Sequence, residues 1–289
     1  MAASPELRNR QSMPARLRAL LSEPVCHVAP GAFSPFVVPL IEEAGFPLVY
    51  ATGLGAAADI AGYPDVGLIT MTEMVNHIRY IVQRATVPVI ADADTGYGGA
   101  TSAARTVREY EDAGVAGLHI EDQAWPKRCG HLQEKSVIPC DEMVEKIKSA
   151  IAARRDPDFV IIARTDAIAV EGFEAAVSRA RQYVANGADA LFFDAIRTVD
   201  QIRTVAATFD VPLVFNMSIS GLTPRMLPAE LGQLGYRLML FAGGPILATH
   251  HCLRRYFEEI RETGSQDRIL GEMTPLGDFM KSLRIEQYL

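Results

Sequence analysis

Eight short apolar runs recur along this chain, and each is followed by a longer segment with helical periodicity. Because the runs are apolar on both faces, they suit parallel strands that are covered by helices. Eight such alternations in 289 residues predict an α/β fold, a (β/α)8 barrel of the TIM type. An open, doubly wound sheet is the alternative. The runs are 25–29, 48–51, 87–91, 117–120, 159–163, 190–193, 212–215 and 238–241.

Amphipathic segments between the runs predict the helices of the barrel. Glycine follows several of them, as is common after the last turn of a helix. We expect a single domain over 1–289, with a helical segment at 1–23. A helical extension at 250–289 exceeds what a barrel needs, and we expect part of it to pack on another subunit. The clearest helical segments are 100–113, 141–153, 173–186 and 199–209.

Composition narrows the classes of partner. The formal net charge of −7 argues against a broad surface for nucleic acid or anionic membrane. No run approaches the roughly 20 apolar residues of a membrane span. Segment 1–23 mixes arginines with short apolar pieces and lacks the apolar core of a signal peptide, which predicts a cytoplasmic protein. The four cysteines are widely spaced, which favours thiols over disulfides.

Four carboxylates fall where strands are predicted to end. Asp92 and Asp94 follow one run, Glu121 ends the next, and Asp65 lies in a nearby loop. The carboxyl ends of barrel strands meet on one face, so these side chains are expected to converge. Oxygen ligands favour Mg2+, with Mn2+ also suitable. The alternative is that the carboxylates cap helices or form salt bridges.

A second cluster is the sequence Lys127-Arg128-Cys129-Gly130-His131, in the loop after the fourth run. A thiol flanked by cationic side chains is expected to have a lowered pKa and to act as an acid-base group. The adjacent glycine is a candidate hinge for closing the loop over substrate. The alternative is an incidental cysteine.

Two further features predict carboxylate binding. The glycine-rich segment 53–58 superficially fits a dinucleotide fingerprint, but no acidic residue ends a strand about 20 positions later. We interpret it instead as a backbone amide cradle for a substrate carboxylate, assisted by Thr52. Arg164 is predicted either to clamp a carboxylate or to pair with Asp166 or Glu121. His119 is interpreted as a core histidine.

Taken in order, these motifs resemble the isocitrate lyase and phosphoenolpyruvate mutase superfamily over nearly the whole chain. The loop around Cys129 is typical of its lyases, including the 2-methylisocitrate and alkylmalate lyases, although oxaloacetate hydrolases and one phosphonate-forming mutase also carry it. The motifs that carry the resemblance are 50–53, 62–65, 92–98, 119–123, 127–131 and 163–167.

The resemblance implies Mg2+ held by Asp92 and, partly through water, by Asp65, Asp94 and Glu121. It implies substrate contacts from Tyr50, Thr52, Gly53 and Arg164, and tetramers that exchange helices. The implied reaction is a retro-aldol cleavage, in which the 2-hydroxyl loses its proton, the bond between C2 and C3 breaks, and Cys129 protonates the departing acid. Lys127, Arg128 and His131 are expected to favour the thiolate and to bind carboxylates.

The chain departs from the family pattern around the distal part of the substrate. Asp194 stands at the sixth strand end, where family lyases usually have Glu. The loop after the seventh run lacks a common Glu, and Ala242-Gly243-Gly244-Pro245 follows the eighth run, where the family commonly has Tyr-Pro-Leu. Leu54 stands where related lyases often have Gly or Tyr. The remaining expected substrate contacts are Leu54, Arg128, Gly130, Asp194, Asn216 and Ser218.

The sequence therefore predicts a carbon-carbon lyase that cleaves a 2-hydroxy di- or tricarboxylic acid, of the 2-methylisocitrate or alkylmalate type, to pyruvate or glyoxylate and a second acid. Decarboxylation or hydrolysis of oxaloacetate is an alternative that uses the same metal. Phosphonate chemistry is another, because the amides of Gly243 and Gly244 could bind an anion. A barrel that has lost activity is the non-enzymatic alternative.

Overall fold

The structure, a computed structural model, describes residues 11–130, 134–219 and 221–289. Within them, eight parallel strands pair in sequence order and β8 pairs with β1, which closes a barrel. The predicted (β/α)8 barrel is confirmed, and the open sheet is excluded. The strands are β1 (His27–Ala32), β2 (Val49–Ala51), β3 (Val89–Asp92), β4 (Gly117–Glu121), β5 (Val160–Thr165), β6 (Ala190–Phe193), β7 (Leu213–Asn216) and β8 (Tyr236–Phe241).

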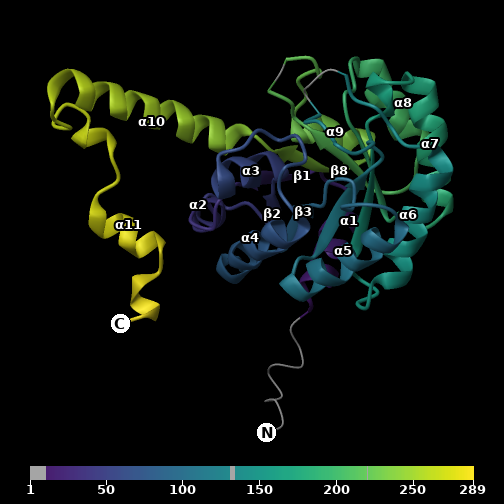
Figure 1. The fold of residues 1–289 in the computed structure, drawn as a ribbon, viewed down its shortest axis with the longest axis horizontal. Helices are drawn as coiled ribbons and strands as arrows, with labels where there is room; N and C mark the ends of the chain where they lie inside the picture. Colours follow the sequence, from purple (N-terminus) through teal and green to yellow (C-terminus); the bar gives the residue numbers. More distant parts are fainter. Residues whose placement is uncertain (1–10, 131–133, 220) are drawn as a thin grey trace, which may run out of the picture.

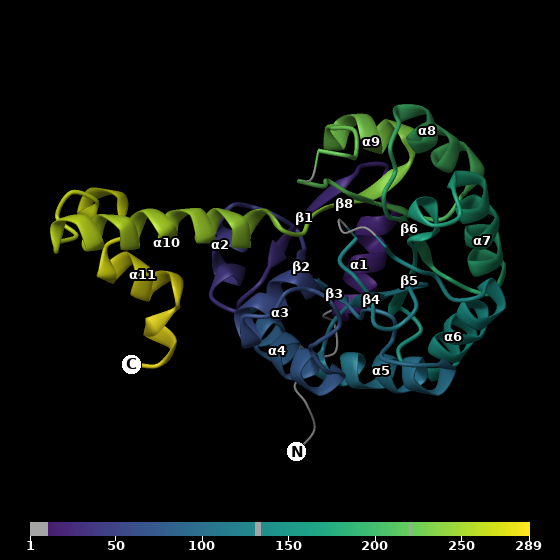
Figure 2. The same ribbon diagram turned by 45° about the horizontal axis from the view of Figure 1, so that its top comes forward.

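Helices surround the barrel as a ring (Figure 2). The predicted helical segments are confirmed to within one residue, and Gly114 ends α5 with a φ of 90° that a side chain would disfavour. The helices are α1 (Met13–Ser22), α2 (Val37–Glu43), α3 (Gly53–Ala61), α4 (Met71–Arg84), α5 (Ala100–Ala113), α6 (Cys140–Ala153), α7 (Phe173–Ala185), α8 (Val199–Thr208), α9 (Pro228–Leu234), α10 (Gly244–Thr263) and α11 (Leu276–Ser282), with short 3-10 turns η2 (Ala167–Ala169), η3 (Leu270–Glu272) and η4 (Ile285–Gln287).

Buried residues form two cores. The larger lies between the strands and the surrounding helices, and the smaller fills the barrel interior with side chains such as Ile90, Phe192 and Leu238. Leu17 and Leu21 of α1 join the interior core, and a Cβ at Gly117, the first residue of β4, would meet Leu17. Helix α1 thus closes the amino end of the barrel, which leaves the carboxyl end for a site.

The strand register fixes which polar side chains are neighbours at that end. Asp92 on β3 lies opposite His119 on β4, and Glu121 on β4 lies opposite Arg164 on β5. Adjacent strands in a sheet are about 5 Å apart, so these pairs are brought within reach of one another by backbone pairing alone.

The C-terminal segment forms an arm. Helix α10 projects from the barrel, and the chain then turns back through η3, α11 and η4 (Figure 1). Beside η4, Arg284 pairs with Glu42 of α2 at 2.9 Å, and Arg84 of α4 donates to the Leu283 carbonyl at 2.8 Å. The expected helical extension is confirmed, although α10 begins at Gly244, where Pro245 fits the first turn. Neither α10 nor α11 has a buried residue, and Phe257 is 63% exposed. The predicted packing of this arm on another subunit stays a prediction.

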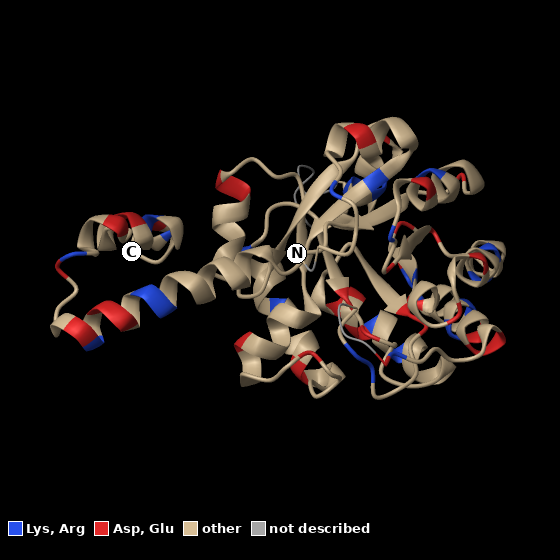
Figure 3. Cartoon of the chain, turned by 90° about the horizontal axis from the view of Figure 1, so that it is seen from above, with Lys and Arg blue, Asp and Glu red and all other residues tan. Residues whose placement is uncertain are grey.

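Charged residues of both signs are interspersed along the outer helices and α10 (Figure 3). Of the helices in the described part of the chain, none combines the length and the apolar composition that a bilayer crossing requires. Segment 1–23 is described only from residue 11, and α1 lies within it.

Candidate active site

Asp92 is the most tightly held carboxylate at the barrel mouth. Its Oδ1 accepts the Asp94 N–H at 2.9 Å, and its Oδ2 accepts the Gly53 N–H and the Tyr50 hydroxyl, both at 3.3 Å. Burial alone would raise its pKa, but His119, Lys127 and Arg164 lower the pKa of Asp92 to about 2. The first amide of the expected cradle therefore binds a carboxylate of the chain itself.

Tyr50 and His119 lie side by side behind Asp92. The Tyr50 hydroxyl is 2.8 Å from His119 Nε2, and both side chains are buried. Burial lowers the pKa of His119 to about 4, and burial together with Asp92 raises the pKa of Tyr50. Both groups are thus neutral near pH 7. Among the described residues His119 Nδ1 has no hydrogen-bond partner, so the interpretation of a satisfied core histidine holds for one nitrogen only.

Lys127 lies between two of the predicted metal ligands. Its Nζ contacts Asp65 Oδ1 and is 2.7 Å from Asp94 Oδ1, and its side chain is 3% exposed. Burial alone would lower the pKa of Lys127, but Asp94 and Asp65 raise it. In the part of the chain that the structure describes, no three acidic, His or Cys side chains are gathered as a metal site. The ammonium thus neutralises two of the four carboxylates that the sequence predicted to hold a cation.

Glu121 supplies the remaining candidate ligand. It is 1% exposed, and neither of its carboxylate oxygens accepts a hydrogen bond from a described residue, although Arg164 Nη1 lies 3.2 Å from Oε2. A buried carboxylate with unfilled acceptor positions is unfavourable unless a cation or a polar group satisfies it. The donor chemistry at this end of the barrel therefore fits a hard cation.

Arg164 forms the salt bridges that were the alternative to a clamp. Its Nε and Nη2 donate to Asp166 at 2.8 and 3.1 Å, and its guanidinium lies 5.1 Å from the centre of the Phe192 ring. It is 8% exposed and still lines the active-site cavity. Asp166 thus accepts hydrogen bonds from two nitrogens of Arg164, while the remaining guanidinium nitrogen, Nη1, faces Glu121.

The Cys129 loop is attached to the barrel by backbone contacts. The Gln123 side chain bonds both the N–H and the carbonyl of Arg128 at 2.9 Å, and the Cys129 N–H donates to the Asp65 carbonyl at 3.0 Å. Arg128 is exposed and pairs with Glu134. A Cβ at Gly130 would lie 2.6 Å from Asp194 Oδ2, so glycine is required for this close approach. His131 lies outside the described residues.

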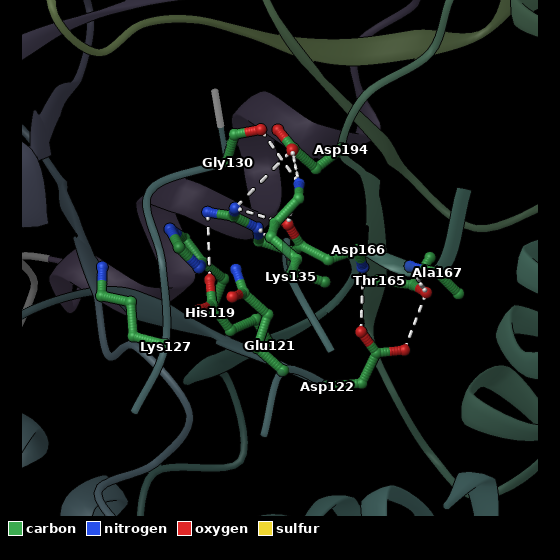
Figure 4. A network of polar contacts seen from close by, with 12 residues as sticks. His119, Glu121, Asp122, Lys127, Gly130, Lys135, Thr165, Asp166, Ala167 and Asp194 are labelled. Carbon is green, nitrogen blue, oxygen red and sulfur yellow. Dashed lines mark hydrogen bonds and ion pairs between the residues drawn. The ribbon is translucent and has the colours of Figure 1, made fainter. Parts of the chain in front are cut away.

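Lys135 is the functional residue that sequence reasoning missed. Its Nζ donates to the Gly130 carbonyl at 2.9 Å, to Asp166 Oδ1 at 2.7 Å and to Asp194 Oδ2 at 3.0 Å, with the side chain 2% exposed (Figure 4). In turn, Asp122 accepts the Asp166 N–H at 2.8 Å. No signal in the sequence marked Lys135, because a lysine in a loop is ordinarily solvated.

One cavity at the carboxyl end gathers most of the expected site. The described residues that were predicted for the site but do not line this cavity are Gly53, Asp94, Glu121, Lys127, Arg128 and Ser218. Three residues that were predicted to act on or bind the substrate line it from different strands: Tyr50 of β2, Arg164 of β5 and Asn216 of β7. The barrel therefore brings distant motifs together. The residues that line the cavity are Tyr50, Thr52, Leu54, Asp65, Asp92, Cys129, Gly130, Arg164, Asp194 and Asn216, together with Phe192, Leu240, Ala242 and Gly243.

A family model described as phosphoenolpyruvate phosphomutase matches residues 17–261. The chain is 43% identical over 282 residues to a probable 2-methylisocitrate lyase of Corynebacterium glutamicum, covering 97% of this chain and 91% of that one. The chain belongs to the isocitrate lyase and phosphoenolpyruvate mutase superfamily. A 2,3-dimethylmalate lyase of Eubacterium barkeri is 39% identical, with 94% of each chain covered.

Solved structures of this superfamily agree with the fold. A 2,3-dimethylmalate lyase crystal structure has a TM-score of 0.91 at 34% identity, covering 96% of this chain and 94% of that one. A phosphonopyruvate hydrolase complex with oxalate and Mg++ has a TM-score of 0.87 at 29% identity, covering 96% and 97%. The superfamily resemblance is confirmed, and its named lyase members place this chain among the carbon-carbon lyases.

Proposed function

We propose that the chain cleaves the bond between C2 and C3 of a 2-hydroxy di- or tricarboxylic acid, of the 2-methylisocitrate or alkylmalate type, and releases pyruvate or glyoxylate with a second acid. The observation that carries this proposal is that Cys129 lines the same cavity as Asp92 and Arg164. A proton donor thus faces a site that combines carboxylates suited to a cation with an arginine suited to a substrate carboxylate.

The metal is proposed to be Mg2+, with Mn2+ as a substitute. Asp92 would hold it, together with Asp65, Asp94 and Glu121 directly or through water. The unfilled oxygens of Glu121 support this assignment. When bound, the cation would supply Lewis-acid stabilisation of the developing charge on the substrate oxygen. Before the cation binds, Lys127 neutralises Asp65 and Asp94. When these two carboxylates bind the cation, the Lys127 ammonium would turn toward the substrate.

The chain's own residues bind the substrate and move one proton. Arg164 and Thr52 would bind the carboxylate of the pyruvoyl half, and the neutral Tyr50 phenol would donate a hydrogen bond to its oxygen. When the C2–C3 bond breaks, its electron pair stays with the departing acid, and the Cys129 S–H protonates that carbon. The proton lost by the 2-hydroxyl would pass through solvent to the Cys129 thiolate and restore the thiol, so the net reaction needs no co-reactant.

The assembly is proposed to be a cytoplasmic homotetramer. The exposed apolar side chains of the C-terminal arm support an oligomer, because monomeric proteins rarely leave such a projecting apolar surface uncovered. They include Leu253, Phe257, Leu270, Leu276 and Phe279.

Release of keto acid with Mg2+ tests the function over 2-methylisocitrate, 2,3-dimethylmalate, isocitrate, oxaloacetate and phosphonopyruvate, for wild type beside Cys129→Ser. We expect pyruvate or glyoxylate from a hydroxy acid, lost in the variant. Turnover of oxaloacetate alone, surviving Cys129→Ser, would instead identify a decarboxylase or hydrolase. Turnover of phosphonopyruvate alone would identify phosphonate chemistry, and no turnover of any of these acids would contradict the proposal.

A further inference from the structure

Three apolar side chains converge over Gly243 at the end of β8. Leu54 comes from the first turn of α3, Ile219 from the loop after β7, and Leu247 from the first turn of α10. A methyl group on Gly243 would lie 3.3 Å from Leu54 Cδ2, 3.3 Å from Ile219 Cδ1 and 4.0 Å from Leu247 Cδ1. We call Leu54, Ile219 and Leu247 the apolar wall. A side chain at position 243 would be slightly too close to Leu54 and Ile219, and glycine avoids this crowding.

The wall stands at the edge of the active-site cavity, because Leu54 and Gly243 both line that cavity. The cavity therefore has two unlike sides. Asp92 and Arg164 lie on the side formed by β3 and β5, whereas Leu240 and Ala242 continue the apolar surface along β8. A substrate whose pyruvoyl half occupies the charged side would direct its other half toward the wall.

A third carboxylate would find no countercharge there. Among the described residues that line the cavity, Arg164 is the one cationic side chain, and Asp166 already accepts two of its N–H groups. The start of α10, residues 244–249, contains neither Lys nor Arg, and Pro245 removes one of the amide donors of its first turn. Asp194 also lines the cavity, and it already occupies the buried ammonium of Lys135 at 3.0 Å. Ile219 and Leu247 are 53% and 47% exposed in the single chain. A carboxylate that lost water against them would gain no cation in return, which is unfavourable.

We propose that the apolar wall selects an alkyl group on C3, so that the substrate is an alkyl-substituted malate and not a tricarboxylic acid. This inference rests on the proposed lyase function and defines its substrate class. The same apolar surroundings disfavour a phosphonate group over Gly243.

Three acids that share the 2-methylmalate frame test the wall: one with methyl on C3 (2,3-dimethylmalate), one with propyl, and one with carboxymethyl (2-methylisocitrate). Each buried methylene contributes about 0.8 kcal/mol, or roughly fourfold. We expect kcat/KM for the propyl compound to exceed that for the methyl compound. The carboxymethyl group is similar in size to propyl, but we expect kcat/KM for the carboxymethyl compound to be at least about tenfold below that for the propyl compound. A wild-type preference for carboxymethyl would overturn the proposal.

Leu247→Arg places a cation in the wall and is expected to reverse the preference between carboxymethyl and propyl. Leu227→Arg is the matched control, since Leu227 is an exposed leucine, 65% accessible, outside the wall at the start of α9. The control should leave the ratio of the two kcat/KM values unchanged. An unchanged ratio in Leu247→Arg would count against the wall.

Calorimetric binding of the same acids to Mg2+-loaded Cys129→Ser protein separates this inference from the proposed function, because binding does not need turnover. Tighter binding of propyl than carboxymethyl, reversed in Cys129→Ser with Leu247→Arg, would support the wall even if no acid is cleaved. Equal or tighter binding of the carboxymethyl acid would refute the wall while leaving lyase activity to be judged by keto-acid release.

Discussion

Lys135 Nζ lies 3.0 Å from Asp194 Oδ2 and also donates a 2.9 Å hydrogen bond to the carbonyl of Gly130, the residue that follows Cys129. A single buried ammonium thus joins the Cys129 loop to the end of β6. It also joins the loop to Asp166, the residue that follows β5. The position of the thiol depends on this contact as well as on the loop's own backbone.

Lys135→Met is expected to lower kcat at least about tenfold, because the loop loses its attachment to Asp194 and Asp166. Removing one partner of a buried ion pair also costs about 3–5 kcal/mol of unfolding free energy. Lys135→Arg keeps the charge and should retain part of the kcat and part of the unfolding free energy that Lys135→Met loses. Steady-state kinetics and urea unfolding measure the two effects, and kcat equal to wild type in a folded Lys135→Met protein would refute the attachment.

Barrel geometry explains why the sequence predicts so much of this site. Asp92 and Glu121 end their strands, and Arg164 is the last residue but one of β5. Closing the barrel places the carboxyl ends of all strands on one face whatever the helices do. Ion pairs between distant loops are different. The contact between Lys127 and Asp65 joins positions about 60 residues apart, and no spacing rule connects them. Lys135 was missed for the same reason.

Lys127 competes with a cation for Asp65 and Asp94. Because its ammonium contacts both carboxylates, we expect Lys127→Met to bind Mg2+ at least about tenfold more tightly than wild type without substrate. The value of kcat should fall, because the variant lacks the Lys127 ammonium that would contact the substrate. Calorimetric titration with Mg2+ gives the affinity. Arg128→Met, which removes an exposed cation of the same loop, is the control and should leave Mg2+ affinity near that of wild type. Weaker binding in Lys127→Met would contradict this competition.

Asp166 predicts a pH dependence of stability. Burial alone would raise its pKa, but Arg164 and Lys135 hold the pKa of Asp166 well below its ordinary value of 3.8. A carboxyl group with a depressed folded-state pKa stabilises the protein above its unfolded pKa, and that contribution is lost as the pH falls below about 3.8. Asp166→Asn should therefore be less stable than wild type at pH 7.

The stability difference between wild type and Asp166→Asn is expected to narrow as the pH falls from 4 toward 2, because in this range Asp166 takes up a proton in the unfolded chain but not in the folded protein, and the variant has no such group. Urea unfolding at several pH values measures it. Asp200→Asn, at a carboxylate whose side chain is 90% exposed, is the control and should show little difference from wild type at any pH. A difference for Asp166→Asn that stays constant with pH would show that Asp166 does not titrate in this range.

The C-terminal arm predicts that assembly depends on its apolar side chains. Phe257 on α10 is 63% exposed in the single chain, and burying an aromatic side chain of this size between subunits contributes about 1.5–3 kcal/mol. Phe257→Asp should shift a tetramer toward smaller species, as measured by light scattering after size-exclusion chromatography. Arg203→Asp on α8, a helix of the barrel, changes charge at an exposed position and is the matched control. A tetramer that survives Phe257→Asp at low protein concentration would place the subunit contact elsewhere, whereas a monomeric wild type would refute the proposed assembly itself.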